Sequence, residues 1–60
     1  MIEIEVTLIT DGNEVYKVES HLTGESAWIS KSICKLRLRE KSVTGVLTLP
    51  ENIASEKRLI

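Results

Sequence analysis

Two stretches of this 60-residue chain alternate between apolar and polar side chains, and this alternation constrains the fold more than any other feature. Successive side chains of a β-strand point to opposite faces, so a period of two predicts strands with one buried face. The first stretch, residues 2–9, has Ile2, Ile4, Val6 and Leu8 on one side and Glu3, Glu5 and Thr7 on the other. The second, residues 33–41, has Leu36 and Leu38 on one side and Lys35, Arg37, Arg39 and Lys41 on the other.

The segment TDGNEV joins the first alternating stretch to a second short one, VYKVES, and carries a hairpin signal. Its central residues, Asp-Gly-Asn at 11–13, are types that tolerate the positive φ of many tight turns. A three-residue loop at these positions predicts a β-hairpin over residues 2–20. This register sets Leu8 opposite Tyr16 and keeps the apolar side chains of both strands on one face.

Three further strands and one helix are predicted in the rest of the chain. The strands lie at roughly residues 26–29, 33–40 and 43–49, and the helix at roughly 50–58. Pro50 suits the first position of the helix, and Ile53, Ala54 and Ile60 can share its apolar stripe. We therefore expect a single domain that is mainly β: a small five-stranded antiparallel sheet, or a barrel-like domain of the SH3 or OB type, with one short C-terminal helix.

The small size of the chain predicts association. A 60-residue domain buries only about 60% of its unfolded surface, so its stability is marginal. One cysteine (Cys34) cannot form an intramolecular disulfide, and with one histidine (His21) it provides too few ligands for a closed zinc site. With no metal or cofactor expected, the remaining support is a homo-oligomer or a partner protein.

The sequence contains no membrane or export signal. No apolar run approaches the roughly 18 residues that a membrane-spanning helix needs, and the N-terminus lacks the basic and apolar regions of a signal peptide. A single unpaired cysteine fits a reducing compartment. These features predict a cytoplasmic protein that does not contact membranes.

The net charge of −1 hides an asymmetry, because residues 1–30 carry a net charge of −5 and residues 31–60 carry +4. Four of the cations form the basic stripe, Lys35, Arg37, Arg39 and Lys41, at alternate positions of one predicted strand. The stripe has two interpretations. It can follow a phosphate backbone while Trp28 stacks on a base, or its arginines can pair with Glu3 and Glu5 on a solvated face. The sequence pI of about 5.7 and the scarcity of aromatic residues favour the second.

Three other residues have a structural and a functional interpretation. Trp28 is expected in the core, since the chain has few aromatic residues, although an exposed Trp28 would be an interface anchor. Cys34 shares the side of Leu36 and Leu38, so we expect a buried structural thiol. His21 with nearby serines and Asp11 supplies the residue types of a hydrolytic triad, but no spacing fixes that geometry. No enzymatic activity is predicted.

Two segments resemble known families. AWISKSI (27–33) and LTLPENIASEKRLI (47–60) resemble the W-[IL]-P-K-S-x-[IV] and T-L-P-x-x-x-A-x-E-K-x-L-I segments of short phage and prophage proteins, over about a third of the chain. Ser30 replaces a proline of that pattern and Arg58 a glycine. This resemblance implies a bacterial host cell as the setting. GVLTLPENI (45–53) is similar to V-T-[IL]-P-x-x-[IL] of AbrB-type DNA-binding proteins, which implies the alternative of an antitoxin or transcription regulator module.

The combined prediction is a non-enzymatic binding protein of phage type. It would bind and modulate or inhibit a host or viral protein, for example a component of a host defence system, as a homo-oligomer. Trp28 would anchor the partner and the cations would steer an acidic surface toward it. The predicted partner-binding residues are Trp28, Lys31, Lys35, Arg37 and Arg39. Nucleic-acid binding through the basic stripe is the alternative.

Overall fold

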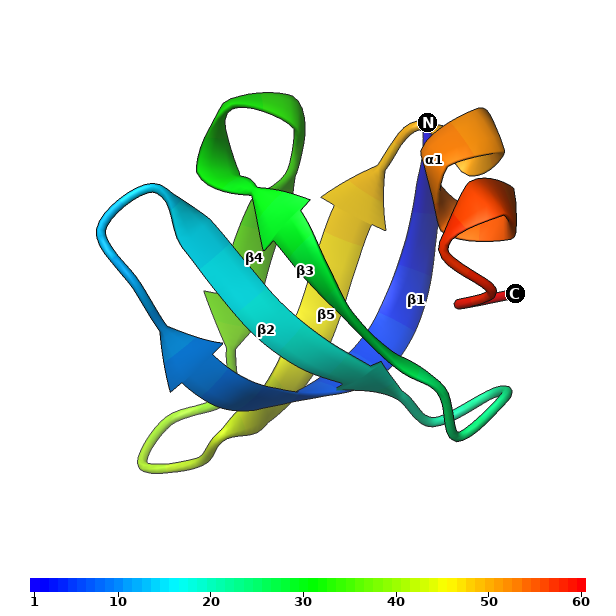
Figure 1. Cartoon of the computed structure of the whole chain (residues 1–60). Helices are drawn as coiled ribbons and strands as arrows, with labels where there is room; N and C mark the ends of the chain where they lie inside the picture. The colour runs from blue at the N-terminus through cyan, green and yellow to red at the C-terminus, as the bar shows by residue number, and fades with distance from the viewer.

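The computed structural model describes all 60 residues as one antiparallel sheet with a short helix at its C-terminal end (Figure 1). The strands are β1 (Ile2–Asp11), β2 (Val15–Ser20), β3 (Ser26–Ser30), β4 (Lys35–Leu38) and β5 (Thr44–Leu49). A 3₁₀-helix, η1 (Lys31–Ile33), links β3 to β4, and α1 (Glu51–Glu56) follows β5. The strand order is β3-β2-β1-β5-β4, which confirms the predicted five-stranded antiparallel sheet with one short helix.

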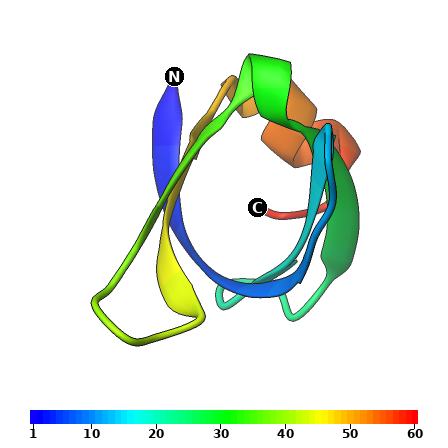
Figure 2. The same cartoon turned by 90° about the vertical axis from the view of Figure 1, so that its left-hand side faces the viewer.

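The sheet is strongly curled but does not close into a barrel. Figure 2 shows the strands arranged around an open ring, with α1 at one side of it. The two end strands of the sheet, β3 and β4, each pair with only one neighbour. The chain therefore keeps two strand edges that have no partner within the molecule.

The register between β1 and β5 gathers the apolar side chains on the inner face of the curl. Ile2 lies opposite Leu49 and Ile4 opposite Leu47, and β4 adds Leu36 beside Leu47. The buried core consists of Val6, Val18, Ile29, Cys34, Leu47, Leu49, Ala54 and Leu59. The alternation thus predicted the inner face correctly for the first stretch and for Leu36, whereas Leu38, at the end of β4, is 37% exposed and does not pack against the core.

The predicted hairpin register was wrong, because β1 continues to Asp11 and its turn lies further along the chain. The Gly12 N–H donates to the Val15 carbonyl at 2.9 Å, so the turn is at residues 13–14. A β-bulge between Leu8 and Thr10 then shifts the pairing by one residue, which places Leu8 opposite Val18 instead of Tyr16. The bulge keeps Leu8 on the inner face, since a one-residue slip would otherwise turn it outward.

The strand predicted at residues 33–40 is shorter in the structure, because a 3₁₀ turn precedes it. The Ser30 hydroxyl accepts a hydrogen bond from the Ser32 N–H at 3.3 Å and caps η1. Such local bonding is what serine hydroxyls offer as an alternative to a regular ladder. Strand β4 then spans only Lys35–Leu38.

Helix α1 ends at Glu56, two residues before the predicted end, in a turn that needs a left-handed residue. Arg58 has φ of 60°, and its N–H bonds to the Ser55 carbonyl while the Leu59 N–H bonds to the Ala54 carbonyl. This pair of bonds is a Schellman motif, in which the left-handed position is normally glycine. The turn buries Leu59 and leaves Ile60 39% exposed, so the predicted apolar stripe was wrong at Ile60.

Ser20 fastens the C-terminal segment to the sheet. Its hydroxyl is buried, donates to the Leu59 carbonyl at 2.6 Å and accepts from the Leu22 N–H at 3.1 Å. The Thr23 hydroxyl donates to the Arg58 carbonyl at 2.8 Å. Because a buried polar group is costly unless it is bonded, these contacts fix where the last residues cover the core.

Gly45 allows β4 to pack tightly against β5. A Cβ atom at this position would lie 2.1 Å from the Arg37 carbonyl oxygen and 2.6 Å from the Leu38 Cα, both in the backbone of β4. Neither group can move away without displacing the edge strand. Gly45 therefore marks a close approach of two backbones.

We predict that Gly45→Ala lowers the free energy of unfolding by about 3 kcal/mol or more, because the added methyl group collides with backbone atoms. Gly24→Ala is the matched control. Gly24 has φ of 79° with no atom within 4 Å of an added Cβ, so only the conformational cost of about 1 kcal/mol applies. Urea denaturation measures both. Equal losses for the two variants would contradict the close approach of β4.

Candidate functional site

The structure does not bring the predicted binding residues into one patch. Trp28 lies on β3 at one edge of the sheet, while Lys35 and Arg37 lie on β4 at the other. Lys31 belongs to η1 between them, and Arg39 follows the end of β4. The candidate site therefore divides into a surface around Trp28 and a surface on the outer face of β4.

Trp28 is on the outer face and 48% exposed, so its predicted place in the core was wrong. The reason is the alternation of β3, which turns Ile29 inward and fully buries it. Trp28 pairs with Lys17 of β2, whose ammonium nitrogen lies 5.7 Å from the centre of the indole ring. This cation–π contact covers part of the ring and leaves the rest to solvent.

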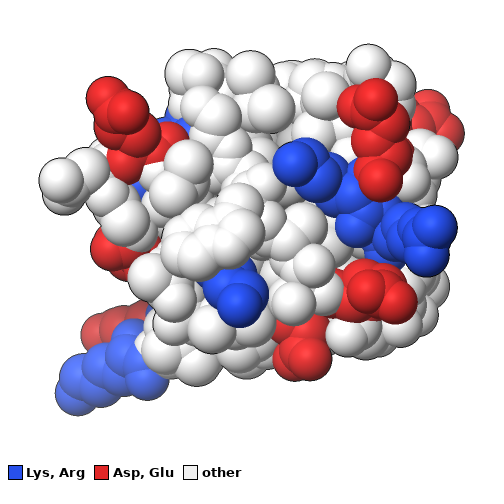
Figure 3. All heavy atoms as spheres, in the orientation of Figure 1, with Lys and Arg blue, Asp and Glu red and all other residues white.

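The surface over β3 and β2 is largely uncharged. In Figure 3 the middle of this face is formed mainly by neutral atoms with one basic group among them, and acidic and basic groups gather toward its margins. Sequence reasoning did not single out Lys17, the cation of this surface. The sequence places Lys17 in the second predicted strand, but it does not show which residue lies opposite. Only the β2–β3 register of the structure shows that Lys17 lies opposite Trp28.

Lys31 is engaged within the chain and does not extend freely into solvent. Its ammonium nitrogen lies 2.7 Å from a carboxylate oxygen of Asp11 and 4.7 Å from the centre of the Tyr16 ring. The hydrogen bond to Asp11 raises the pKa of Lys31. These contacts tie η1 to the first hairpin, so Lys31 has a structural role that its sequence position did not reveal.

The basic stripe is partly neutralised by β1, although β5 lies between them. Arg39 Nη2 forms an ion pair and hydrogen bond with Glu5 Oε1, as the solvated-face interpretation predicted, but the expected pairing of Glu3 with Arg37 does not form. That hydrogen bond lowers the pKa of Glu5 and raises the pKa of Arg39. Lys35 and Arg37 pair across the ladder with Thr48 and Val46, and they form no ion pair. Two of the predicted steering cations are therefore free.

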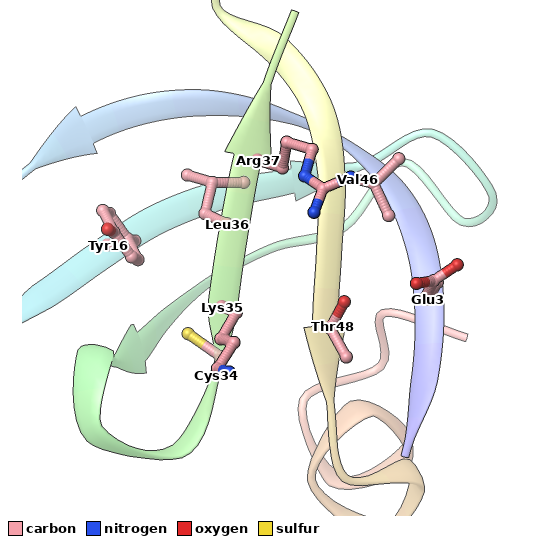
Figure 4. Close-up of a pocket in the computed structure, with 8 residues that line it drawn as sticks. All are labelled: Glu3, Tyr16, Cys34, Lys35, Leu36, Arg37, Val46 and Thr48. Atoms are coloured by element: carbon pink, nitrogen blue, oxygen red, sulfur yellow. The ribbon is translucent and has the colours of Figure 1, made fainter.

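A hollow of about 570 Å³ runs along both sides of β4 instead of forming one enclosed cavity. Figure 4 shows Tyr16, Cys34 and Leu36 on one side of the strand, with Arg37, Val46, Thr48 and Glu3 on the other. The strand itself separates the two groups. A small molecule bound on either side would contact only part of the lining, which is less enclosure than ligand sites usually provide.

The remaining chemically reactive side chains are dispersed. Cys34 is only 7% exposed, burial raises its pKa, and its thiol donates to the Ser30 carbonyl at 3.3 Å. His21 Nε2 lies 2.6 Å from the Thr7 hydroxyl oxygen, whereas Asp11 binds Lys31. No group of three His, Cys, Asp or Glu side chains is placed to hold a metal ion. The residue types of a triad are present but are not assembled.

Comparison with known proteins gives no match: no family model, curated protein or solved structure is significantly similar to the chain. The resemblance to short phage and prophage proteins thus stays a prediction. Neither helix of the structure has the length and apolar character to cross a membrane.

We predict that Cys34 reacts with a thiol-specific reagent at pH 8 about 100-fold more slowly in the folded protein than in urea, because reaction requires local opening. Burial also raises the folded pKa above the unfolded value of about 8.5. The stability linked to the neutral thiol is therefore fully present below the unfolded pKa and is lost as the pH rises from there through the higher folded pKa. Equal rates with and without urea would contradict a structural Cys34.

Proposed function

We propose that this protein is a non-enzymatic binding protein that contacts another protein through the surface around Trp28. The observation that carries the proposal is the half-exposed Trp28 on the outer face of an edge strand whose other apolar residues, Ala27 and Ile29, pack against the core. Tryptophan is enriched among the few residues that dominate binding energy in protein interfaces. A chain of this size gains little by leaving so large an apolar side chain in water.

One cation on this surface and two on the opposite edge strand favour an acidic partner. Lys17 lies beside the indole ring, and Lys35 and Arg37 are free of ion pairs on the other edge strand. Cations at the margin of an interface chiefly increase the association rate and the selectivity. We therefore assign the anchoring role to Trp28 and the steering role to Lys17, Lys35 and Arg37, with Lys31 and Arg39 holding the fold.

The setting that we propose is the cytoplasm of a bacterial cell, with a phage-encoded protein acting on a host or viral protein. The two phage-like segments support this setting, and the reduced, buried Cys34 fits a reducing compartment. A binder that covers a surface of a host enzyme or defence component needs no active site of its own. Modulation or inhibition by occlusion is the mechanism that follows.

We predict that Trp28→Ala lowers the affinity for the captured partner by at least about thirtyfold, since an interface anchor contributes 2 kcal/mol or more. The partner is captured from bacterial lysate with the immobilised chain and then titrated by calorimetry. Val43→Ala is the matched control, because Val43 is 58% exposed in the β4–β5 turn. Unchanged capture by Trp28→Ala would remove the β3 surface from the interface.

Charge reversal separates protein binding from the nucleic-acid alternative. Arg37→Glu should slow association with an acidic protein partner and reduce its salt dependence. In a mobility-shift titration at low salt, the wild-type chain should not retard duplex or single-stranded DNA, because its net charge is −1 and its unpaired cations are spread over both edges of the sheet. Retardation that disappears in Arg37→Glu would favour the nucleic-acid function instead.

A further inference from the structure

The free edge of β3 presents unpaired backbone groups. The backbone N–H of Lys31 donates to the Glu14 carbonyl at 2.9 Å, and the backbone N–H of Ser20 donates to the Glu25 carbonyl at 2.8 Å. These two bonds fix which residue pairs of the β2–β3 ladder are hydrogen-bonded. In an antiparallel ladder, bonded and non-bonded pairs alternate, so Ala27 and Ile29 direct their N–H and C=O groups toward β2. The N–H and C=O groups of Ser26, Trp28 and Ser30 therefore point away from the sheet.

The other free edge is protected against pairing, whereas this one is not. Strand β4 carries Lys35 and Arg37 and is followed by Arg39, so self-pairing would set cations against cations. Strand β3 has the sequence Ser-Ala-Trp-Ile-Ser, with no charge, no proline and no bulge. Charged side chains, proline and bulges are features that proteins use to block edge-to-edge pairing, and β3 has none of these three.

The sequence of β3 is self-complementary about Trp28. In an antiparallel pair with a two-fold axis at Trp28, each Ser26 lies opposite Ser30 of the second copy. On the inner face, the small Ala27 lies opposite the large Ile29. In an isologous dimer, the residue at the two-fold axis contacts its own equivalent, and every other contact is formed twice. The sequence of β3 allows this arrangement.

The charges that flank β3 also fit a second copy. The same register brings Glu25, which precedes the strand, to the level of Lys31 of the second copy, which follows the strand and keeps its ion pair with Asp11 of its own chain. The contact occurs twice by symmetry. The two Lys17 side chains are separated by three strand spacings, about 14 Å, which exceeds the screening length of about 8 Å at physiological salt.

We propose that two copies of this chain associate edge to edge through β3, in antiparallel register about Trp28, to form one continuous ten-stranded sheet. The outward N–H and C=O groups of Ser26 and Trp28 and the N–H of Ser30 provide the hydrogen bonds, and the Ser30 carbonyl, which already accepts from the Cys34 thiol, has a second lone pair for the partner. The dimer sets the two Trp28 rings side by side on the outer face, so it also doubles the apolar surface offered to a partner. This association does not depend on the proposed function and is measured on the purified chain alone.

Sedimentation equilibrium of the full chain over a thousandfold concentration range tests the proposal. We expect a reversible rise in mass toward twice the 6.7 kDa of one chain. Because Trp28 is the only tryptophan, pairing should also produce an exciton couplet in the far-ultraviolet circular dichroism that disappears on dilution. A single-chain mass at every concentration would overturn the proposal, as would a mass that rises without the couplet.

Two variants locate the interface. Trp28→Lys places two cations at the axis and should weaken the dimer by about tenfold or more. The control, Val43→Lys, adds the same charge at an exposed site in the β4–β5 turn and should not weaken the dimer. Ser26→Pro keeps Trp28 but removes an outward N–H at the first position of an edge strand, and should also weaken association. Amide NMR spectra establish that each variant is folded. Folded Trp28→Lys and Ser26→Pro proteins that dimerise like the wild type would overturn the proposal.

Discussion

The register between β1 and β5 is the constraint on which the rest of this structure depends. It places the apolar side chains of residues 2–8 and 45–49 on one face, and a curled sheet is the way a chain with so few residues can enclose that face. The curl requires β4 to lie close against β5, which the missing side chain of Gly45 permits. Helix α1 and Leu59 then cover one side of the enclosed core, and two strand edges remain unpaired.

The sequence predicted those parts of the fold that follow from side-chain periodicity. Alternation identified β1 and β4 and the face of each residue from Ile2 to Leu8 and from Lys35 to Arg37, because the period of a strand is a local property. It could not locate the first turn, since the bulge at Ile9 is set by the need to keep Leu8 inside after β1 lengthens to Asp11. It could not select Leu59 over Ile60, because the left-handed turn at Arg58 decides which of them reaches the core.

The candidate site was harder to predict than the fold, for the same physical reason. Trp28 was expected in the core on the basis of its size, but the phase of β3 is set by Ile29, which fills the core position. The four cations of the basic stripe share a face by periodicity, yet whether each is free depends on neighbours distant in sequence. Only the structure shows that Arg39 is held by Glu5 while Arg37 is not.

The two edges of the sheet give the molecule an asymmetry that its composition conceals. One edge carries fixed positive charge that opposes strand addition, and the other carries an uncharged strand centred on a tryptophan. A small protein whose core is limited can complete itself by pairing such an edge, and it can use the same exposed ring to hold a partner. In the proposed dimer and the proposed interface, association and recognition would depend on the same five residues of β3.

Amide hydrogen exchange in dilute, monomeric solution tests the two free edges most directly. We predict slow exchange for the N–H groups of Ala27, Ile29 and Arg37, which bond to neighbouring strands, and fast exchange for those of Trp28 and Leu36, which face the open edges. Slow exchange at Trp28 and Leu36 in the monomer would mean that the edges are joined. Fast exchange at Ile29 or Arg37 would mean that the registers described above are wrong.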